Sequence, residues 1–258
     1  GGNIRAGSYF EACGIGPGSY RISAVIPPPE GQEDGLRYAS EIFTVGDTTV
    51  RLPPLNLQPS FPLSGTVTVS GEKTDDPLPS GLHFSLAPKD RFLNYGENTS
   101  AKEDSTGKFT FPAMTADQYW LDIFGIPSGY YVKQARLGVN DILSAPFFAA
   151  PGAEIEIVLG SDGPSISGQV TDSDNQPVAD ATVVLATNPP QSTRADQDGR
   201  FTLNGMAPGD YRIAAFRGLQ DGLAEDPNFI QANFGRATEL TLGPSATVSV
   251  NLTAQPTN

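Results

Sequence analysis

Short stretches in which apolar and polar residues alternate recur along the whole chain. The clearest is DGRFTLNGMAPGDYRIAAF (198–216), where a glycine turn leads into an alternating segment, a Pro-Gly corner and a second alternating segment that opens at Tyr211. Alternation with a period of two places successive side chains on opposite faces of a β-strand. The pattern therefore predicts a strand, a tight corner and a second strand.

The same pattern occurs twice more, as TGKFTFPAMTADQYWLDIF (106–124) and AGSYFEACGIGPGSYRISAV (6–25). The step from Gly107 to Tyr119 equals the step from Gly199 to Tyr211, so these two copies align without a gap. We expect one extra residue in the first copy, between Tyr9 and Tyr20. An internal repeat of this kind predicts tandem structural units.

Three modules follow from the repeat: a first module (residues 1–60), a second (61–162) and a third (163–258). The second and third open with related segments, LSGTVTVS (63–70) and ISGQVT (166–171), each followed by an apolar strand, at 78–87 and 181–185. Each of the three modules is expected to close with an alternating strand, at 48–52, 154–159 and 247–252. In the first module we also predict strands at 9–12, 20–26 and 38–45, and a stiff linker from Pro53 to Pro62. Residues 226–237 are expected to hold one short helical turn.

The first module lacks the opening Ser-Gly-x-Val segment and the strand after it, about thirty residues by comparison with the third. Without these strands a sandwich has an open sheet edge and an unfilled core. Two explanations stay open. Either the missing part lies outside the ordered or included sequence, or another chain donates a strand, which would produce a head-to-tail homopolymer.

Composition excludes several classes of function. The net charge of −13 opposes contact with the phosphates of nucleic acid and with anionic membranes. No run of 18 apolar residues is present, so no membrane insertion is expected. The single cysteine, Cys13, cannot form an intrachain disulfide and is expected to be a small buried residue. Because the chain begins at Gly1-Gly2, we expect either a removed leader or a window of a longer protein.

The third module resembles the carboxypeptidase regulatory-like domain, a transthyretin-like (prealbumin-like) or Ig-like β-sandwich. The second is similar but has Ala116-Asp117 where the family has Pro-Gly, and YYVKQARLGVNDIL (130–143) is similar to a variant in exported repeat proteins of soil bacteria such as acidobacteria. The resemblance implies an all-β fold of tandem sandwich modules, the first incomplete, and a non-catalytic role. The matching positions are Gly168, Val170, Pro177, Ala181, Val183, Asp198, Gly199, Phe201, Pro208, Gly209 and Tyr211.

No catalytic, cofactor or metal site is predicted. His83 is the one histidine, and it alternates with apolar neighbours in GLHFSL, which indicates an exposed strand position. Four aspartates (Asp172, Asp174, Asp196 and Asp198) have the side-chain type that Ca²⁺ prefers, but Asp-rich turns hydrogen-bond to their own backbone in the same way. We therefore interpret them as turn residues.

The most informative aromatic residue is Trp120, which the repeat aligns with Arg21 and Arg212 on the outward face of its strand. An outward Trp is either covered by its own module or forms an interface with a neighbouring module, another chain or a sugar. Tyr95, Tyr130 and Tyr131 are candidates to extend that interface. Asn98 and Asn251 match the Asn-x-Ser/Thr glycosylation pattern.

From the sequence we expect a non-catalytic extracellular or cell-surface protein of a bacterium, acting as a spacer, stalk or filament subunit, without a cofactor. Its partners are then other copies of itself, a glycan or a surface protein. Two alternatives stay open: a carbohydrate- or protein-binding module that uses the Trp120 face, and an accessory segment of a larger exported enzyme or outer-membrane transporter.

Overall fold

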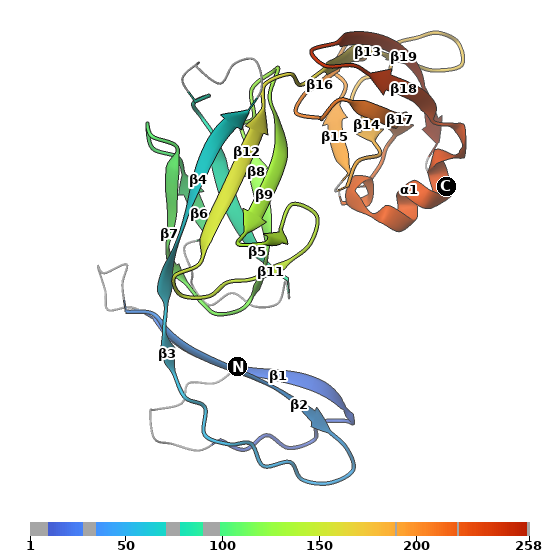
Figure 1. The fold of residues 1–258 in the computed structure, drawn as a ribbon. Helices are drawn as coiled ribbons and strands as arrows, with labels where there is room; N and C mark the ends of the chain where they lie inside the picture. The colour runs from blue at the N-terminus through green and yellow to red at the C-terminus, as the bar shows by residue number, and fades with distance from the viewer. Residues whose placement is uncertain are drawn as a thin grey trace.

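The fold is that of a computed structural model, which describes residues 10–27, 35–70, 78–89, 99–188, 190–220 and 222–256. Strands make up most of it, and the α-helix among the described residues is short (Figure 1). The all-β prediction is confirmed. No helix in the described ranges is long and apolar enough to cross a membrane.

The first module is a small antiparallel sheet in the order β1-β2-β3. It contains β1 (Gly18–Ile26), β2 (Arg37–Val45) and β3 (Gln58–Pro59). None of the hydrophobic core clusters found among the described residues includes a residue of this sheet. Figure 1 shows the hairpin of β1 and β2 below the second module, to which the chain passes through β3 and β4.

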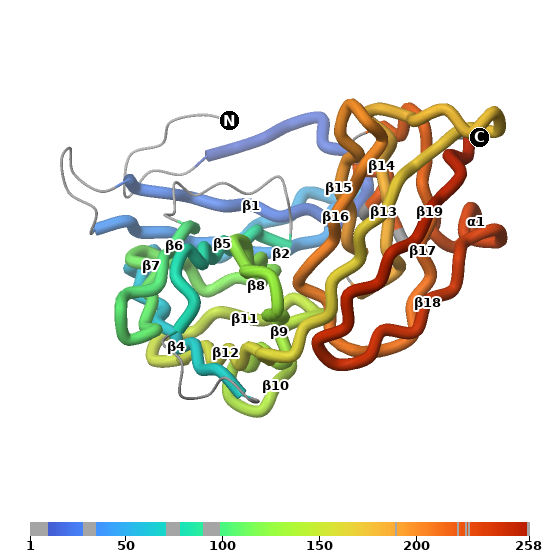
Figure 2. The backbone as a smooth tube through the Cα atoms, turned by 90° about the horizontal axis from the view of Figure 1, so that it is seen from above, coloured from blue at the N-terminus to red at the C-terminus, as the bar shows by residue number. Residues whose placement is uncertain are grey.

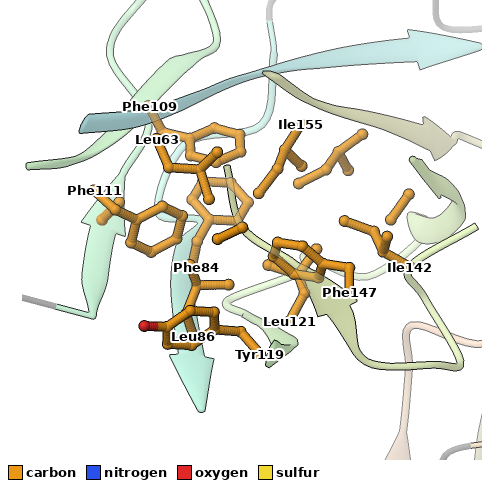
Figure 3. Packing of buried hydrophobic residues seen from close by; sticks show 14 of the residues in the cluster. Leu63, Phe84, Leu86, Phe109, Phe111, Tyr119, Leu121, Ile142, Phe147 and Ile155 are labelled. Atoms are coloured by element: carbon orange, nitrogen blue, oxygen red, sulfur yellow. The ribbon is translucent and has the colours of Figure 1, made fainter. Parts of the chain in front are cut away.

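The second module is a sandwich of two sheets, ordered β10-β9-β12-β4-β7 and β11-β8-β5-β6. The five strands of the first sheet are β10 (Asn140–Asp141), β9 (Tyr131–Leu137), β12 (Glu154–Gly160), β4 (Phe61–Ser70) and β7 (Lys108–Met114). The four of the second are β11 (Phe147–Phe148), β8 (Gln118–Phe124), β5 (His83–Pro88) and β6 (Ser100–Lys102). Phe84 of β5 stacks on Phe109 of β7 with ring centroids 4.1 Å apart, so aromatic side chains join the two sheets in the core (Figure 3).

The third module has the strand order β15-β14-β17-β19-β13-β16, with β18 beside β17. The strands are β13 (Ser165–Thr171), β14 (Thr182–Leu185), β15 (Gln191–Arg194), β16 (Arg200–Leu203), β17 (Gly209–Arg217), β18 (Thr238–Leu242) and β19 (Thr247–Pro256). Between β17 and β18 lie the 3-10 turns η1 (Leu223–Glu225) and η2 (Phe234–Arg236) and the helix α1 (Pro227–Asn233). The predicted helical turn is confirmed, and Asp226 caps it by accepting from the N–H of Asn228.

The second and third modules share one topology. In each, the opening strand (β4 or β13) lies between a parallel closing strand (β12 or β19) and an antiparallel strand (β7 or β16). The apolar strand that follows (β5 or β14) pairs with the strand that carries the repeated tyrosine (β8 or β17). Figure 2 shows β13, β16 and β19 of the third module side by side. The sequence repeat is therefore a structural repeat.

The repeated tyrosine makes the same contact in all three modules. Its hydroxyl lies within hydrogen-bonding distance of the carbonyl oxygen four residues earlier, which closes the corner before the strand. The pairs are Tyr20 with Gly16 (2.9 Å), Tyr119 with Thr115 (3.4 Å) and Tyr211 with Ala207 (2.7 Å). The first module therefore keeps the corner and the tyrosine strand of a complete module, although it has fewer strands.

Gly14 and Gly205 each lie six residues before the repeated tyrosine, and both adopt a left-handed backbone with φ of 74° and 83°. From these glycines onward the first and third copies align without a gap. The extra residue expected between Tyr9 and Tyr20 stays a prediction, because Tyr9 lies outside the described residues.

Two strands predicted for the first module are absent from the described residues: 10–12, the described part of the 9–12 segment, and 48–52. The predicted linker is also partly wrong. Pro59 ends β3, which pairs with β2, and Pro62 lies inside β4 where the pairing with β7 shifts register. A strand tolerates a proline at such an irregularity because no ladder hydrogen bond is needed from its nitrogen.

Candidate interaction sites

The first module contacts the second at the corner between β7 and β8. Arg21 Nη1 of β1 donates to Asp117 Oδ2 at 2.7 Å, with both side chains partly buried. The hydroxyl of Tyr38, a buried residue of β2, accepts from the backbone N–H of Ala116. An ion pair and a backbone hydrogen bond thus hold the hairpin against the next module.

This corner is where the second module departs from the family pattern. The equivalent residues of the third module are Pro208 and Gly209, which offer neither a backbone N–H at the first position nor a carboxylate at the second. Ala116 and Asp117 supply both groups. The departure seen in the sequence therefore corresponds to a contact between modules.

The outward position after the repeated tyrosine has a different environment in each module. Arg21 pairs with the next module, as described above. Arg212 lies 5.9 Å from the ring centroid of Phe234, beneath the helical segment of its own module. Trp120 is 40% exposed, which agrees with the outward orientation predicted for it. Among the three positions after the repeated tyrosine, the one in the second module holds an exposed aromatic residue.

Trp120 lies on the outward face of the sheet β11-β8-β5-β6, where two other aromatic residues are exposed and Asp122 lies between Trp120 and Phe124 along β8. Phe124 and Phe148 are 57% and 55% exposed, and both lie on the outward side of that sheet with Trp120. Phe148 pairs across the strands with Gln118. Gln118 lies two residues before Trp120 in β8, so its side chain is on the same face of the sheet. We call Trp120, Phe124 and Phe148 the aromatic face.

Tyr130 and Tyr131, two of the other predicted interface residues, do not join the aromatic face. Tyr131 is buried, and its ring lies where a Cβ at Gly160 would stand. Burial raises the pKa of its hydroxyl, and the nearby Asp162 carboxylate raises it further. Tyr130 is partly buried against the core of the second module. Tyr95 lies outside the described residues.

Of the two glycosylation candidates, Asn98 lies outside the described residues. Asn251 is exposed and lies within β19, in register with Gln169 of β13. Its modification stays a prediction.

The aspartates have the turn role that was predicted for them. Asp172 Oδ1 accepts from the N–H groups of Asp174 and Gln176 at 3.0 and 2.9 Å, and these bonds hold its pKa below the usual value. Asp196 accepts in the same way from Asp198 and Arg200. Among the described residues no three His, Cys, Asp or Glu side chains are grouped closely enough to hold a metal ion.

His83 is exposed at the start of β5, as predicted. Cys13, expected to be buried, is exposed. The reason is that residues 10–17 form no strand and are all exposed. The expectation of a buried cysteine is therefore wrong.

Core positions of the complete modules are exposed in the first. Phe109 and Phe201 are 2% and 4% exposed, whereas Phe10 at the same place is 44% exposed. Met114 and Met206 are 0% and 2% exposed, whereas Ile15 is 40% exposed. Val50, in the segment that corresponds to the closing strands, is also 40% exposed. The described residues therefore do not bury these three positions of the first module.

Comparison with known proteins supports the family of the third module. Residues 165–255 match the family model of the carboxypeptidase regulatory-like domain, so the predicted resemblance is confirmed there. A search of curated proteins finds no match to the sequence.

Solved structures match the chain at low sequence identity and low TM-score. The Bacillus anthracis TIE protein matches with 12% identity and a TM-score of 0.29, over 93% of this chain and 43% of its own length. The streptococcal ancillary pilin matches with 13% identity and a TM-score of 0.32, over 94% of this chain and 77% of its own. The shaft pilin spaA from Lactobacillus rhamnosus GG matches with 12% identity and a TM-score of 0.28, over 76% and 98%.

Proposed function

We propose that this chain is a non-catalytic structural protein of the bacterial cell surface, a spacer or filament subunit made of tandem β-sandwich modules with boundaries at 1–60, 61–162 and 163–258. The observation that carries the proposal is that one strand topology occurs twice in tandem, in the sheets of the second and third modules. Tandem units of this kind favour a spacer or filament subunit.

The two complete modules fit a load-carrying role. Each has its own hydrophobic cluster, one within residues 61–159 and one within 166–254. The contacts between them are short and polar. Ser128 Oγ donates to Asn204 Oδ1 at 3.3 Å, and Asp162 in the connection accepts from the N–H of Ser245 at 2.7 Å. A protein made of small modules with separate cores becomes longer with each module that is added.

The filament alternative requires the chain to assemble with other copies of itself. If the first module binds a different surface of the next subunit, the contact is heterologous, and contacts of that kind produce filaments when the rotation does not close. Sedimentation velocity and electron microscopy of the purified chain over a hundredfold range of concentration test this. We expect particles that lengthen as the concentration rises, and a monomer at every concentration would contradict the proposal.

A second candidate function rests on the aromatic face. Three exposed aromatic side chains on one sheet suit a planar partner such as a sugar ring, or an apolar surface of another protein. Retention of the chain on immobilised polysaccharides, compared with Trp120→Ala, tests it. Equal retention of the two proteins would exclude glycan binding at this face.

A further inference from the structure

The connection between the second and third modules is short and buried. Residues 161–164 join the end of β12 to the start of β13 (Figure 1). Ser161 is 3% exposed, Gly163 and Pro164 are buried, and Asp162 is partly buried. Linkers between modules that move freely are normally exposed and make few contacts. This connection does not have the character of such a linker.

The backbone of the connection is bonded to the second module. The N–H of Ser161 donates to the carbonyl oxygen of Ser70 at 3.2 Å, and the N–H of Gly163 donates to that of Gly129 at 2.9 Å. A Cβ at Gly163 would lie 3.1 Å from backbone atoms of Gly129 and Tyr130. A glycine therefore allows the connection to lie this close to the segment before β9.

The connection is also bonded to the third module. The carbonyl oxygen of Asp162 accepts from the N–H of Ser245 at 2.7 Å, and Ser165, directly after the connection, donates to the carbonyl oxygen of Ala246 at 2.8 Å. Ser245 has a left-handed backbone with φ of 54°, which is uncommon for a residue with a side chain. The connection is therefore held between the segment before β9 and the turn from β18 to β19.

A buried side chain of the second module holds the connection as well. Tyr131 is 7% exposed, and its ring occupies the space that a Cβ at Gly160 would need. Its hydroxyl is hydrogen-bonded to the Asp162 carboxylate. Burial raises the pKa of this hydroxyl, and the nearby Asp162 and Tyr211 raise it further, so it remains a donor at neutral pH. Because Tyr211 belongs to the third module, groups from both modules and from the connection act on this hydroxyl.

A second contact between the two modules uses other parts of the chain. Ser128 Oγ donates to Asn204 Oδ1 at 3.3 Å, and a Cβ at Gly205 would lie 4.0 Å from Ile126 Cγ2. This contact joins the segment between β8 and β9 to the corner before β17. A hinge needs residues that are free to change φ and ψ, and two separate attachments remove that freedom.

We infer that residues 161–164 form a rigid joint that holds the second and third modules at one fixed angle. Hydrogen bonds to each module fix the connection, and the contact of Ser128 with Asn204 restricts rotation about it. This inference goes beyond the structural role proposed above, which requires modules in tandem but not a fixed angle between them. A fixed angle makes the two modules a stiff unit, so a displacement of one is passed directly to the other.

The test measures the distance between two spin labels on the intact chain. Cys13→Ser removes the native cysteine, and Val139→Cys with Ser249→Cys places one label on each module at exposed positions. Val139→Cys with Lys108→Cys places both labels on the second module as a reference. We expect the two distance distributions to have the same width, because a rigid joint adds no spread. A distribution between the modules at least about twice as wide would overturn the inference.

Matched glycine variants show whether the connection itself sets the angle. Gly163→Val places a side chain against the backbone of residues 129–130 and should widen the distribution between the modules by at least about twofold. Gly243→Val is the control, because Gly243 also precedes a proline and nothing lies within 4 Å of its new Cβ. It should change neither distribution.

The label pair within the second module reports whether each variant is folded. If Gly163→Val does not fold, Gly163→Ala takes its place, because its single methyl group still lies 3.1 Å from the same backbone. An unchanged distribution between the modules in the folded Gly163 variant would overturn the inference.

This experiment fails separately from the proposed function. If the angle is fixed but the particles never lengthen with concentration, the joint stands and the filament is wrong. If the particles lengthen although the distribution between the modules is broad, the assembly stands and the rigid joint is wrong.

Discussion

The hydroxyl of Tyr38 accepts a hydrogen bond from the backbone N–H of Ala116, and this contact crosses from the first module to the second. The third module has Pro208 at the position of Ala116, so the corresponding N–H does not exist there. One residue at a corner that recurs in the chain thus decides whether that corner can donate this hydrogen bond to a neighbouring module.

The first prediction concerns this corner. Ala116→Pro removes the N–H and should release the hairpin of β1 and β2, at a cost of about 1–3 kcal/mol in docking. Hydrogen exchange in β1 and β2 should rise, while the melting temperature of the second module should change little because the third module tolerates Pro208. Ala116→Gly keeps the N–H and serves as the control. Unchanged exchange in Ala116→Pro would show that Arg21 and Asp117 suffice.

The second prediction uses the repeated tyrosine. Replacing it by phenylalanine removes the hydroxyl contact in each module, and the cost should increase with burial, since a lost hydrogen bond matters most in a dry site. We expect about 2 kcal/mol or more for Tyr119→Phe, less for Tyr211→Phe and about 0.5 kcal/mol or less for Tyr20→Phe. Denaturant unfolding of each variant measures this order. A cost for Tyr20→Phe equal to that for Tyr119→Phe would contradict it.

The third prediction concerns glycine in the central strand. Gly168→Ala places a methyl group against the Val250 carbonyl and should destabilise the third module by about 3 kcal/mol or more. Gly209→Ala is the control, because the nearest atom to its new Cβ, in Tyr211, lies at 3.6 Å. Thermal unfolding of the two variants compares them. Similar melting temperatures would mean that β13 and β19 are less closely packed than described.

The fourth prediction concerns acid stability. The N–H groups of Gln176 and Asp174 hold the pKa of Asp172 below its ordinary value of 3.8, so the unfolded chain binds the proton more readily. The stability due to this carboxylate is present above pH 3.8 and is lost as the pH falls through the folded pKa. Asp172→Asn keeps an acceptor oxygen but does not titrate, so its melting temperature should fall less steeply below pH 4. The prediction would be contradicted if the melting temperatures of the unmodified chain and of Asp172→Asn fell in parallel from pH 6 to pH 2.

Sequence reasoning predicted the strands that a module builds from its own residues. The alternation of apolar and polar residues around Tyr119 and Tyr211 was enough to predict these strands and their inward faces. A sheet with one buried face fixes which residues point inward. The turn role of Asp172 was predictable for a similar reason, since its hydrogen bonds are local. The outward orientation of Trp120 followed from its alignment with Arg21 and Arg212.

The errors fall where structure depends on a distant partner. Residues 48–52 have the alternation of a strand, but a closing strand forms only against a partner, and no described strand pairs with them. The exposure of Cys13 was missed because the segment that holds it, residues 10–17, forms no strand and packs against no core. The contact of Tyr38 with Ala116 had one sign in the sequence. The second module has Ala116-Asp117 where the third has Pro208-Gly209.

The claim on which the account depends is that the second and third modules each build a hydrophobic core, whereas residues 10–12 and 48–52 of the first module form no strand. The most direct measurement is hydrogen exchange of the intact chain at high dilution, comparing residues 10–12 and 48–52 with their counterparts in β7 and β12. We predict nearly unprotected amides in the two segments of the first module, and protection at least about a hundredfold greater in Lys108–Met114 and Glu154–Gly160. Equal protection in the two modules would contradict the account, because it would mean that the first module completes its own core.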